Sequence, residues 1–295
     1  MKAVAETIAI VANPAGAKEE SAELRNLLES RGVTVSWLET TEDDPGTGQA
    51  ASAVKAGADT VIACGGDGTV RACIESLIGT ETVLGVVPAG TGNLLARNLD
   101  IPGDVEGAFD CAANGSAATI DVGRFNDEAF AVMAGVGFDG AVMSDTSRES
   151  KERFGALAYV ATAMHHLKDR SFDATISVDG AQVFRGRAKS VLVGNMGRIQ
   201  GGVDLFPDGR PDDGILEVLV LRPEGIWGWF WTAWSILTRR RKAATITRWA
   251  GKSGQIVLDV PQPYELDGDE RPPANRFEFT VEPNSLNLRR KETSP

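Results

Sequence analysis

The stretch Cys64-Gly65-Gly66-Asp67-Gly68-Thr69 joins an apolar segment, residues 60–64, to a segment with helical periodicity, residues 70–78. Glycines at such a turn let successive main-chain N–H groups point at a phosphate, and the helix N-terminus adds partial positive charge. A carboxylate beside a phosphate is repulsive unless it orients a metal ion or accepts a proton. Asp67 is therefore a candidate catalytic residue, and its alternative interpretation is a helix N-cap.

Two further loops have the same character. Asn13-Pro14-Ala15-Gly16-Ala17-Lys18 follows an apolar segment at residues 7–12, and Pro88-Ala89-Gly90-Thr91-Gly92-Asn93 follows another at residues 83–87, with Arg97 one turn further on. Strands expected at 7–12, 33–37, 60–64 and 83–87 alternate with helices expected at 21–31, 49–56, 70–78 and 93–98. This alternation predicts a parallel sheet covered on both faces. The three loops would meet at its carboxyl edge, where open α/β sheets bind ligands.

After about residue 120 the pattern changes to short strands separated by turn residues. Strands are expected at 129–134, 172–178, 182–187, 190–194, 215–221, 255–260 and 276–281, with one helix at 150–168. Asp179-Gly180 is typical of a tight β-hairpin. The sequence thus predicts an α/β plus β architecture, with a Rossmann-like N-terminal domain and a β-rich C-terminal domain.

Composition excludes several classes of protein. The 295 residues carry a net charge of −11, which disfavours nucleic-acid binding. Three cysteines without a C-x-x-C pair and two adjacent histidines do not suit a zinc site or a disulfide framework, which favours a reducing compartment. No apolar stretch reaches the roughly 20 residues of a membrane span. We therefore expect a cytoplasmic protein, and the sequence leaves open whether it is a homodimer.

Two other glycine motifs carry less information. Gly135-Val136-Gly137-Phe138-Asp139-Gly140 fits a dinucleotide-binding pattern, but no acidic residue stands about 20 positions later, so a bend between strands is the simpler interpretation. Gly251-Lys252-Ser253 resembles the end of a P-loop, but Ile246 stands where the earlier glycine should be.

The three loops together resemble the diacylglycerol kinase catalytic-domain family, which includes bacterial lipid kinases, sphingosine kinases and ceramide kinases. The resemblance continues in order through residues 120–123, 136–139, 207–208, 212–214 and 266–268, and so covers most of the chain. It implies an ATP site between an α/β domain and a β-sandwich, with the C-terminus returning to the first domain. The domains would span residues 1–122 with about 283–295, and residues 123–282.

The resemblance also implies roles for single residues. Nucleotide contacts would come from Asn13, Pro14, Ala15, Gly16, Ala17, Thr41, Gly65, Gly66, Asp67, Gly68, Thr69, Val70, Arg71 and Thr91. Asp213 would supply the carboxylate of a magnesium site completed by the carbonyl groups of Arg210 and Ile215, since Mg²⁺ prefers an octahedron of oxygens. Asp212-Asp213-Gly214 is equally compatible with a polar turn whose acids are solvated.

The chain departs from the family at three places. Arg71-Ala72 and Asn93-Leu94 stand where the family often has Asn-Glu and Asn-Asp, and Asp267-Gly268-Asp269 stands for Asp-Gly-Glu. The family's proposed proton acceptor is that last glutamate. The resemblance therefore implies Asp269 as the base, with Glu270 and Asp67 as rivals.

An aromatic segment at residues 226–237 precedes Arg239, Arg240, Arg241 and Lys242. As a helix it would place Trp227, Trp231 and Trp234 on one face. Tryptophans beside a cationic cluster suit the membrane interface, and the alternative is a core helix packed on the sandwich. We expect residues 226–242 to dock reversibly on the inner face of the membrane.

These observations favour an ATP- and magnesium-dependent lipid kinase that phosphorylates the hydroxyl of diacylglycerol or a related lipid. NAD kinases share the Gly-Gly-Asp-Gly-Thr turn, so phosphorylation of a soluble dinucleotide is a second hypothesis. A catalytically inactive, nucleotide-binding regulator attached to the membrane is the third.

Overall fold

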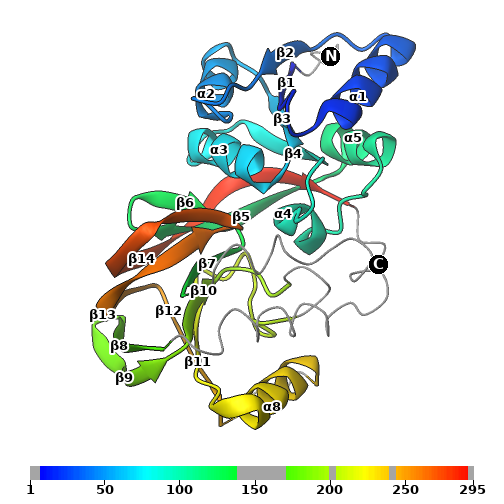
Figure 1. The fold of residues 1–295 in the computed structure, drawn as a ribbon. Helices are drawn as coiled ribbons and strands as arrows, with labels where there is room; N and C mark the ends of the chain where they lie inside the picture. Colours follow the sequence, from blue (N-terminus) through cyan, green and yellow to red (C-terminus); the bar gives the residue numbers. More distant parts are fainter. Residues whose placement is uncertain (1–6, 138–170, 199–203, 239–243, 292–295) are drawn as a thin grey trace. The chain divides into compact units, whose positions relative to one another are not determined.

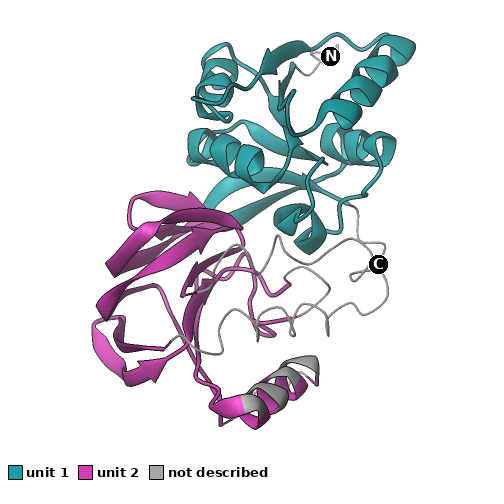
Figure 2. Ribbon diagram, in the orientation of Figure 1, with its two compact units in different colours: residues 1–120, 284–295 teal, residues 121–283 magenta. Residues whose placement is uncertain are grey.

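The computed structural model describes residues 7–137, 171–198, 204–238 and 244–291. The chain forms two compact units, residues 1–120 with 284–295 and residues 121–283 (Figure 2). The sequence placed the two boundaries within two residues of these positions. The predicted fold class is confirmed, since an N-terminal α/β unit is followed by a C-terminal β-sandwich.

The first unit contains a parallel sheet between two layers of helices (Figure 1). The strands are β1 (Ile8–Ala12), β2 (Ser36–Glu39), β3 (Thr60–Gly65) and β4 (Val83–Pro88), in the order β2-β1-β3-β4. The last residues of β14 (Asp269–Arg290) extend this sheet beside β4, also in parallel. α1 (Lys18–Arg31) and α5 (Val105–Asn114) cover one face, and α2 (Thr47–Lys55) and α3 (Asp67–Leu77) cover the other. The short helix α4 (Leu94–Asn98) follows β4.

Local interactions explain where these elements differ from the sequence prediction. β2 begins at Ser36 rather than at residue 33, because the Val33 N–H donates to the Leu28 carbonyl at 3.0 Å in the motif that ends α1. Helix α5 was not predicted. Its signal was Asp104, whose side chain accepts from the Gly107 N–H at 2.7 Å as an N-cap.

The second unit is antiparallel. One run of strands has the order β12 (Ile246–Gly251), β11 (Leu216–Leu221), β10 (Ser190–Gly194), β7 (Met133–Val136), β13 (Ser253–Leu266) and β14. The other strands are β8 (Phe172–Val178) and β9 (Ala181–Ala188), which extend from β13, and β5 (Ser116–Phe125) and β6 (Glu128–Phe130), which extend from β14. Large buried side chains, among them Phe125, Phe277 and Phe279, form the core. Helix α8 (Gly225–Leu237) follows β11.

β13 and β14 each pair with different partners along their length. β13 pairs with β8 through Gly254–Leu258 and with β7 through Tyr264–Leu266, and its register with β14 shifts between these two halves. Pro261 and Pro263 lie in the interval, where they cannot donate to a ladder. This interruption lets one pair of strands serve both layers of the sandwich.

Some predictions for this unit need correction or lie outside the described residues. The predicted strand at 129–134 is two strands, β6 and β7, because the intervening Ala131 and Val132 N–H groups donate to Asp267 rather than to a neighbouring strand. The hairpin at Asp179-Gly180 is confirmed, with φ of 48° and 80°. Phe138, Asp139 and the helix expected at 150–168 lie outside the described residues.

Candidate active site

The loops after β1, β3 and β4 are joined to one another at the carboxyl edge of the first unit's sheet. The Asn13 N–H donates to the Cys64 carbonyl at 3.0 Å, and the Ala89 N–H donates to the Gly65 carbonyl at 3.0 Å. The Asn13 side-chain amide also reaches Thr69 Oγ1 at 3.4 Å. The convergence that the sequence predicted is therefore present in the structure.

The first loop is organised by its asparagine. Asn13 Oδ1 accepts from the N–H groups of Ala15 at 3.1 Å and Gly16 at 2.9 Å, while its main-chain carbonyl accepts from Ala17. Pro14, Ala15 and Gly16 are exposed and Ala17 is buried. The loop is thus a tight asparagine turn whose exposed backbone lies beside the strand ends.

The second and third loops approach each other so closely that only glycine fits. A Cβ on Gly90 would lie 2.8 Å from the Gly66 Cα, and a Cβ on Gly65 would lie 2.7 Å from the Thr69 Cβ. Gly66 is the N-cap of α3 and has no side chain to cover the first N–H groups of the helix. The first turn of α3 therefore offers bare main-chain donors, which is the arrangement a phosphate requires.

Asp67 is not the N-cap of α3, because Gly66 holds that position and no side chain caps the helix. Asp67 Oδ1 accepts instead from the N–H of Leu94, the first residue of α4, at 2.6 Å. The N-cap position of α4 is Asn93, which has a left-handed backbone with φ of 48°. Its amide is used within the third loop, where it exchanges hydrogen bonds with Gly90 at 3.0 and 2.7 Å. The carboxylate of Asp67 thus links two of the three turns.

The other expected nucleotide contacts divide by exposure. Thr41 follows β2 and is exposed, and its hydroxyl accepts from the Asp44 N–H at 3.1 Å. Thr91 is exposed in the third loop, and Arg71 is half-buried in α3. Val70 is buried and its N–H donates to the Gly66 carbonyl. Gly68 is half-buried in the first turn of α3.

The hairpin between β13 and β14, in the second unit, separates two aspartates that the sequence placed side by side. Asp267 is buried, and its carboxylate accepts from the N–H groups of Ala131, Val132 and Met133 at 2.7 to 2.9 Å. Asp269 is half-buried at the start of β14 and Glu270 is exposed. Because side chains alternate along a strand, Asp269 and Glu270 project to opposite faces of the hairpin.

The turn around Asp213 also lies in the second unit. Asp213 Oδ1 accepts from the Ile215 N–H at 3.1 Å, and the Gly214 N–H donates to the buried Asp121 at 2.6 Å. Partial burial raises the pKa of Asp213, and the negative charge of Asp121 raises that pKa further. The Arg210 guanidinium lies 3.6 Å from the Asp212 carboxylate, and its positive charge acts in the opposite direction on Asp213.

Sequence reasoning missed a second charged pair in this unit, Glu217 on β11 and Arg248 on β12. Burial raises the pKa of Glu217 to about 7, and the same cause lowers the pKa of Arg248. The Arg248 Nη2 donates to the Leu205 carbonyl at 3.4 Å. The signal was the single acidic residue in the otherwise apolar stretch Leu216–Leu221.

Comparisons with known proteins agree along the whole chain. Residues 7–125 match the diacylglycerol kinase catalytic domain, and residues 131–289 match the YegS C-terminal NAD kinase β-sandwich-like domain. A protein of Enterobacter sp. (strain 638) named "Probable lipid kinase YegS-like" is 27% identical over 96% of this chain and 95% of its own length. A "Diacylglycerol kinase" of Staphylococcus aureus (strain MRSA252) is 30% identical over 74% of this chain and 71% of its own.

Solved structures show the same fold. A diacylglycerol kinase from Bacillus anthracis str. Sterne has a TM-score of 0.77 at 21% identity, with 97% of each chain covered. An NAD kinase from Archaeoglobus fulgidus in complex with ATP has a TM-score of 0.52 at 10% identity, over 97% of this chain and 94% of that chain. At these identities the likeness concerns the fold alone.

Proposed function

Because the chain belongs to the diacylglycerol kinase family and is a lipid kinase that uses ATP, we propose that its acceptor is the hydroxyl of diacylglycerol. The γ-phosphoryl group would pass to that hydroxyl, giving phosphatidic acid and ADP. The observation that carries the proposal is the convergence of three loops whose glycines bring main-chain groups together at one sheet edge.

The geometry of the first unit supports phosphate binding by the backbone. Phosphoryl transfer asks the protein mainly to hold the phosphates and to stabilise the charge that develops on them. The uncapped first turn of α3 supplies N–H donors, and the close approach of Gly66 and Gly90 brings the third loop beside it. The link from Asp67 to the Leu94 N–H keeps the two turns at a fixed spacing.

The proton of the acceptor hydroxyl requires a base, and we assign this role to Asp269. It is half-buried, whereas Glu270 is exposed and projects to the other face of the hairpin. Asp267 does not compete, because its carboxylate already accepts from three main-chain N–H groups. Asp67 keeps the role of orienting the catalytic metal or the hydroxyl, and it remains the alternative base.

The donor set around Asp213 fits magnesium in its chemistry. The Asp213 carboxylate and the carbonyl groups of Arg210 and Ile215 are all hard oxygen ligands. The neighbouring Asp121 and Asp212 add negative charge that a cation would offset. In the described part of the chain no group of three acidic, histidine or cysteine side chains converges on one point, so main-chain oxygens and water would complete the shell. When bound, the ion would hold the shape of this turn.

The test is phosphate transfer from labelled ATP to mixed micelles of diacylglycerol, with NAD and sphingosine as alternative acceptors. We expect transfer to diacylglycerol, and a loss of at least about 100-fold in Asp67→Asn and Asp269→Asn. Asp127→Asn, at an exposed turn between β5 and β6, is the matched control and should keep full activity. Full activity in both site variants would overturn the assignment, and transfer only to NAD would overturn the lipid substrate.

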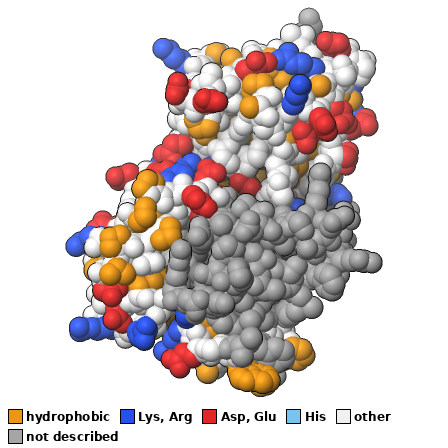
Figure 3. Space-filling view, in the orientation of Figure 1, with side chains coloured by type: hydrophobic (Ala, Val, Ile, Leu, Met, Phe, Trp, Pro, Cys, Tyr) orange, Lys and Arg blue, Asp and Glu red, His pale blue; other side chains and the backbone are white. Residues whose placement is uncertain are grey.

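We further propose that α8 docks the enzyme on a membrane. Trp227, Trp231 and Trp234 lie on one face of the helix and are 73%, 55% and 46% exposed, whereas Thr232 and Ser235 are buried. These exposed tryptophans argue against the alternative of a core helix. Figure 3 shows hydrophobic side chains at the end of the view where Figure 1 places α8.

Such a face suits the interface of a bilayer, where indole rings sit at the level of the headgroups. Arg239 to Lys242, the expected partners of anionic lipid, lie outside the described residues. No helix in the described ranges is long and apolar enough to cross a membrane. We therefore propose reversible attachment of α8 to the inner face of the membrane.

A further inference from the structure

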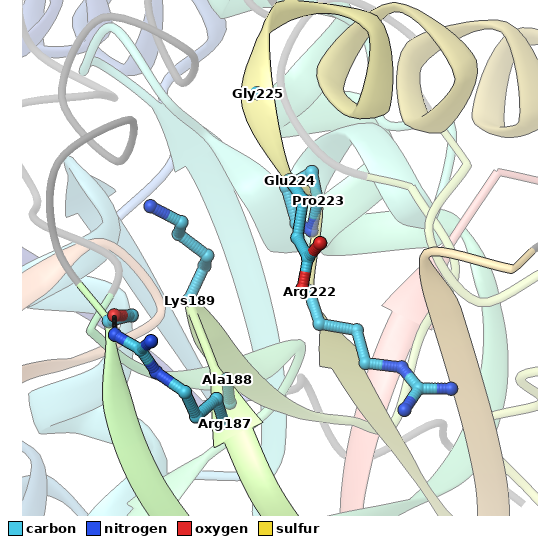
Figure 4. Close-up of a pocket in the computed structure, with 8 residues that line it drawn as sticks. Arg187, Ala188, Lys189, Arg222, Pro223, Glu224 and Gly225 are labelled. Carbon is cyan, nitrogen blue, oxygen red and sulfur yellow. Dashed lines mark hydrogen bonds between the residues drawn. The ribbon is translucent and has the colours of Figure 1, made fainter.

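A cavity of about 400 Å³ lies in the second unit, where α8 begins (Figure 4). One wall comes from Arg187, Ala188 and Lys189, between β9 and β10, and the other from residues 222–225, between β11 and α8. The Lys189 N–H donates to the Leu221 carbonyl at 2.8 Å, so main-chain pairing holds the two walls together. The cavity is therefore built on strands rather than on an isolated loop.

The lining of this cavity is positively charged. Arg187, Lys189 and Arg222 contribute three positive charges and Glu224 one negative charge, which leaves a local excess of two in a chain whose net charge is −11. The Arg187 guanidinium donates to the Ser171 hydroxyl, a neutral partner. Within the ranges that the structure describes, neither Arg187 nor Arg222 forms an ion pair with a carboxylate.

The side chains line the cavity from two directions. Figure 4 shows Arg187 and Lys189 extending from one strand and Arg222 extending from the other. Arg187 and Arg222 are exposed, so their guanidinium groups can reorient toward a ligand without breaking a buried contact. Arginine and lysine side chains in this number suit a phosphate group.

We propose that this cavity binds the phosphate headgroup of an anionic phospholipid and so fixes how the enzyme sits on the membrane. The inference rests on the proposed docking of α8. Gly225 is both a lining residue of the cavity and the first residue of α8. A headgroup in the cavity would therefore belong to the same lipid surface that the three tryptophans contact.

The size of the cavity also selects the lipid headgroup rather than the whole lipid. Sites for small ligands have volumes of roughly 300–1,000 Å³, and this one is near the lower end of that range. It would accommodate a phosphate with its small substituent and leave the acyl chains in the bilayer. The exposed tryptophans give a reason for a lipid-borne phosphate that a free phosphate would not explain.

The test is calorimetric titration of the full chain with dihexanoyl phosphatidylserine below its micelle concentration. This lipid has the anionic headgroup but lacks the free hydroxyl of the proposed substrate. Lys189→Gln/Arg222→Gln is the cavity variant, and Arg185→Gln/Arg276→Gln removes the same charge from exposed positions outside the cavity. We expect the cavity variant to bind roughly 30-fold more weakly, the product of about five- to sixfold for each basic residue. The control should stay within about twofold of the wild type.

Further arms separate the possible outcomes. Dihexanoyl phosphatidylcholine and inorganic phosphate should each bind much more weakly than phosphatidylserine. Asp67→Asn should bind phosphatidylserine normally even though it fails as a kinase, and Trp227→Ala/Trp231→Ala should bind it normally while it loses vesicle binding. Wild-type affinity in the cavity variant would overturn the proposal, as would equally tight binding of inorganic phosphate or phosphatidylcholine. If the double variant fails to fold, Arg222→Gln alone, at an exposed side chain, should weaken binding about fivefold, and an unchanged affinity there would also overturn it.

Discussion

The carboxylate of Asp67 accepts a hydrogen bond from the main-chain N–H of Leu94 at 2.6 Å. The two residues begin different helices, α3 and α4, and are 27 positions apart in the chain. One side chain therefore ties the glycine turn after β3 to the glycine turn after β4. This contact gives Asp67 a structural role in addition to any role in phosphoryl transfer, and the two roles can be separated by substitution.

Asp67→Ala should lower stability by about 1 kcal/mol, because it removes the acceptor for the first N–H of α4. This corresponds to a fall in Tm of about 2–4 °C. Asp67→Asn keeps an oxygen that can accept from Leu94, so its Tm should remain close to that of the wild type while lipid kinase activity is lost. Thermal unfolding by circular dichroism measures both. An equal fall in Tm for the two variants would show that the charge, not the acceptor, stabilises the turn.

Gly90→Ala should disturb the two glycine turns. Its new Cβ would lie 2.8 Å from the Gly66 Cα, a distance that side-chain carbons do not adopt, so the backbone must shift. We expect a loss of about 1–3 kcal/mol in stability and at least tenfold weaker ATP binding, on the order of 1.4 kcal/mol. Gly103→Ala is the control, since a Cβ there meets nothing within 4 Å. Titration with a fluorescent ATP analogue gives the affinity. Wild-type affinity in Gly90→Ala would contradict the proposed cradle.

Asp267→Ala and Asp269→Ala should have opposite effects although the residues are two positions apart. Asp267→Ala leaves three N–H groups without their acceptor. Its cost should be about 3 kcal/mol or more, because each buried unsatisfied donor costs roughly 1–3 kcal/mol. Asp269→Ala should unfold near the wild-type temperature and lose activity. Denaturant unfolding and kinase assays on both variants test this, and the assignment fails if Asp269→Ala is the less stable of the two.

Glu217 should make the protein less stable as the pH rises from about 4.5 to about 7. Burial, assisted by Asp208, Asp204 and Asp213 and opposed by Arg248, raises the pKa of Glu217 from 4.5 to about 7. Over that interval the folded state holds the proton that the unfolded state has lost, so the free energy of unfolding falls until the pH exceeds the folded pKa.

Glu217→Gln removes this penalty. At pH 8 the variant should be more stable than the wild type by about 1 kcal/mol after discounting for the partial exposure of the carboxyl group, or about 2–3 °C in Tm. Near pH 4.5 the two proteins should unfold at the same temperature. Thermal unfolding between pH 4.5 and pH 8 is the measurement. A difference in Tm that does not change with pH would contradict the prediction.

Trp227→Ala/Trp231→Ala should lower binding to anionic vesicles by at least about tenfold, because binding scales with the apolar area that enters the interface. Val257→Ala/Val260→Ala removes exposed apolar side chains from β13 and should not alter binding. Arg239→Glu/Arg241→Glu should weaken binding mainly at low salt, where screening is least. Vesicle co-sedimentation at two salt concentrations distinguishes these variants. If the tryptophan and arginine variants sediment like the wild type, α8 does not dock.

Much of the nucleotide site could be predicted from local sequence. A buried apolar strand, a glycine turn and a helix start are each encoded within a few residues, and β3 with α3 follows that pattern. Since parallel strands end at one edge of a sheet, the same reasoning brings the loops at Asn13, Gly66 and Gly90 together. Tryptophans at helical spacing likewise predicted the shared face of α8.

Other features depended on contacts between residues far apart in the chain. Asp67 meets Leu94, and Asp267 meets the N–H groups of residues 131–133, more than 130 positions away. Those distant bonds split the predicted strand at 129–134 and separate a buried, hydrogen-bonded Asp267 from a half-buried Asp269.

The sequence by itself determined the order of strands, helices and phosphate-type turns, because periodicity and glycine placement act over a few residues. Only the tertiary structure decided which carboxylates are used up by main-chain donors and which tryptophans are exposed. It also decided that three basic residues from two connections line one cavity. Burial and hydrogen-bond partners are set by which distant segments pack together, and no local pattern in the chain records that.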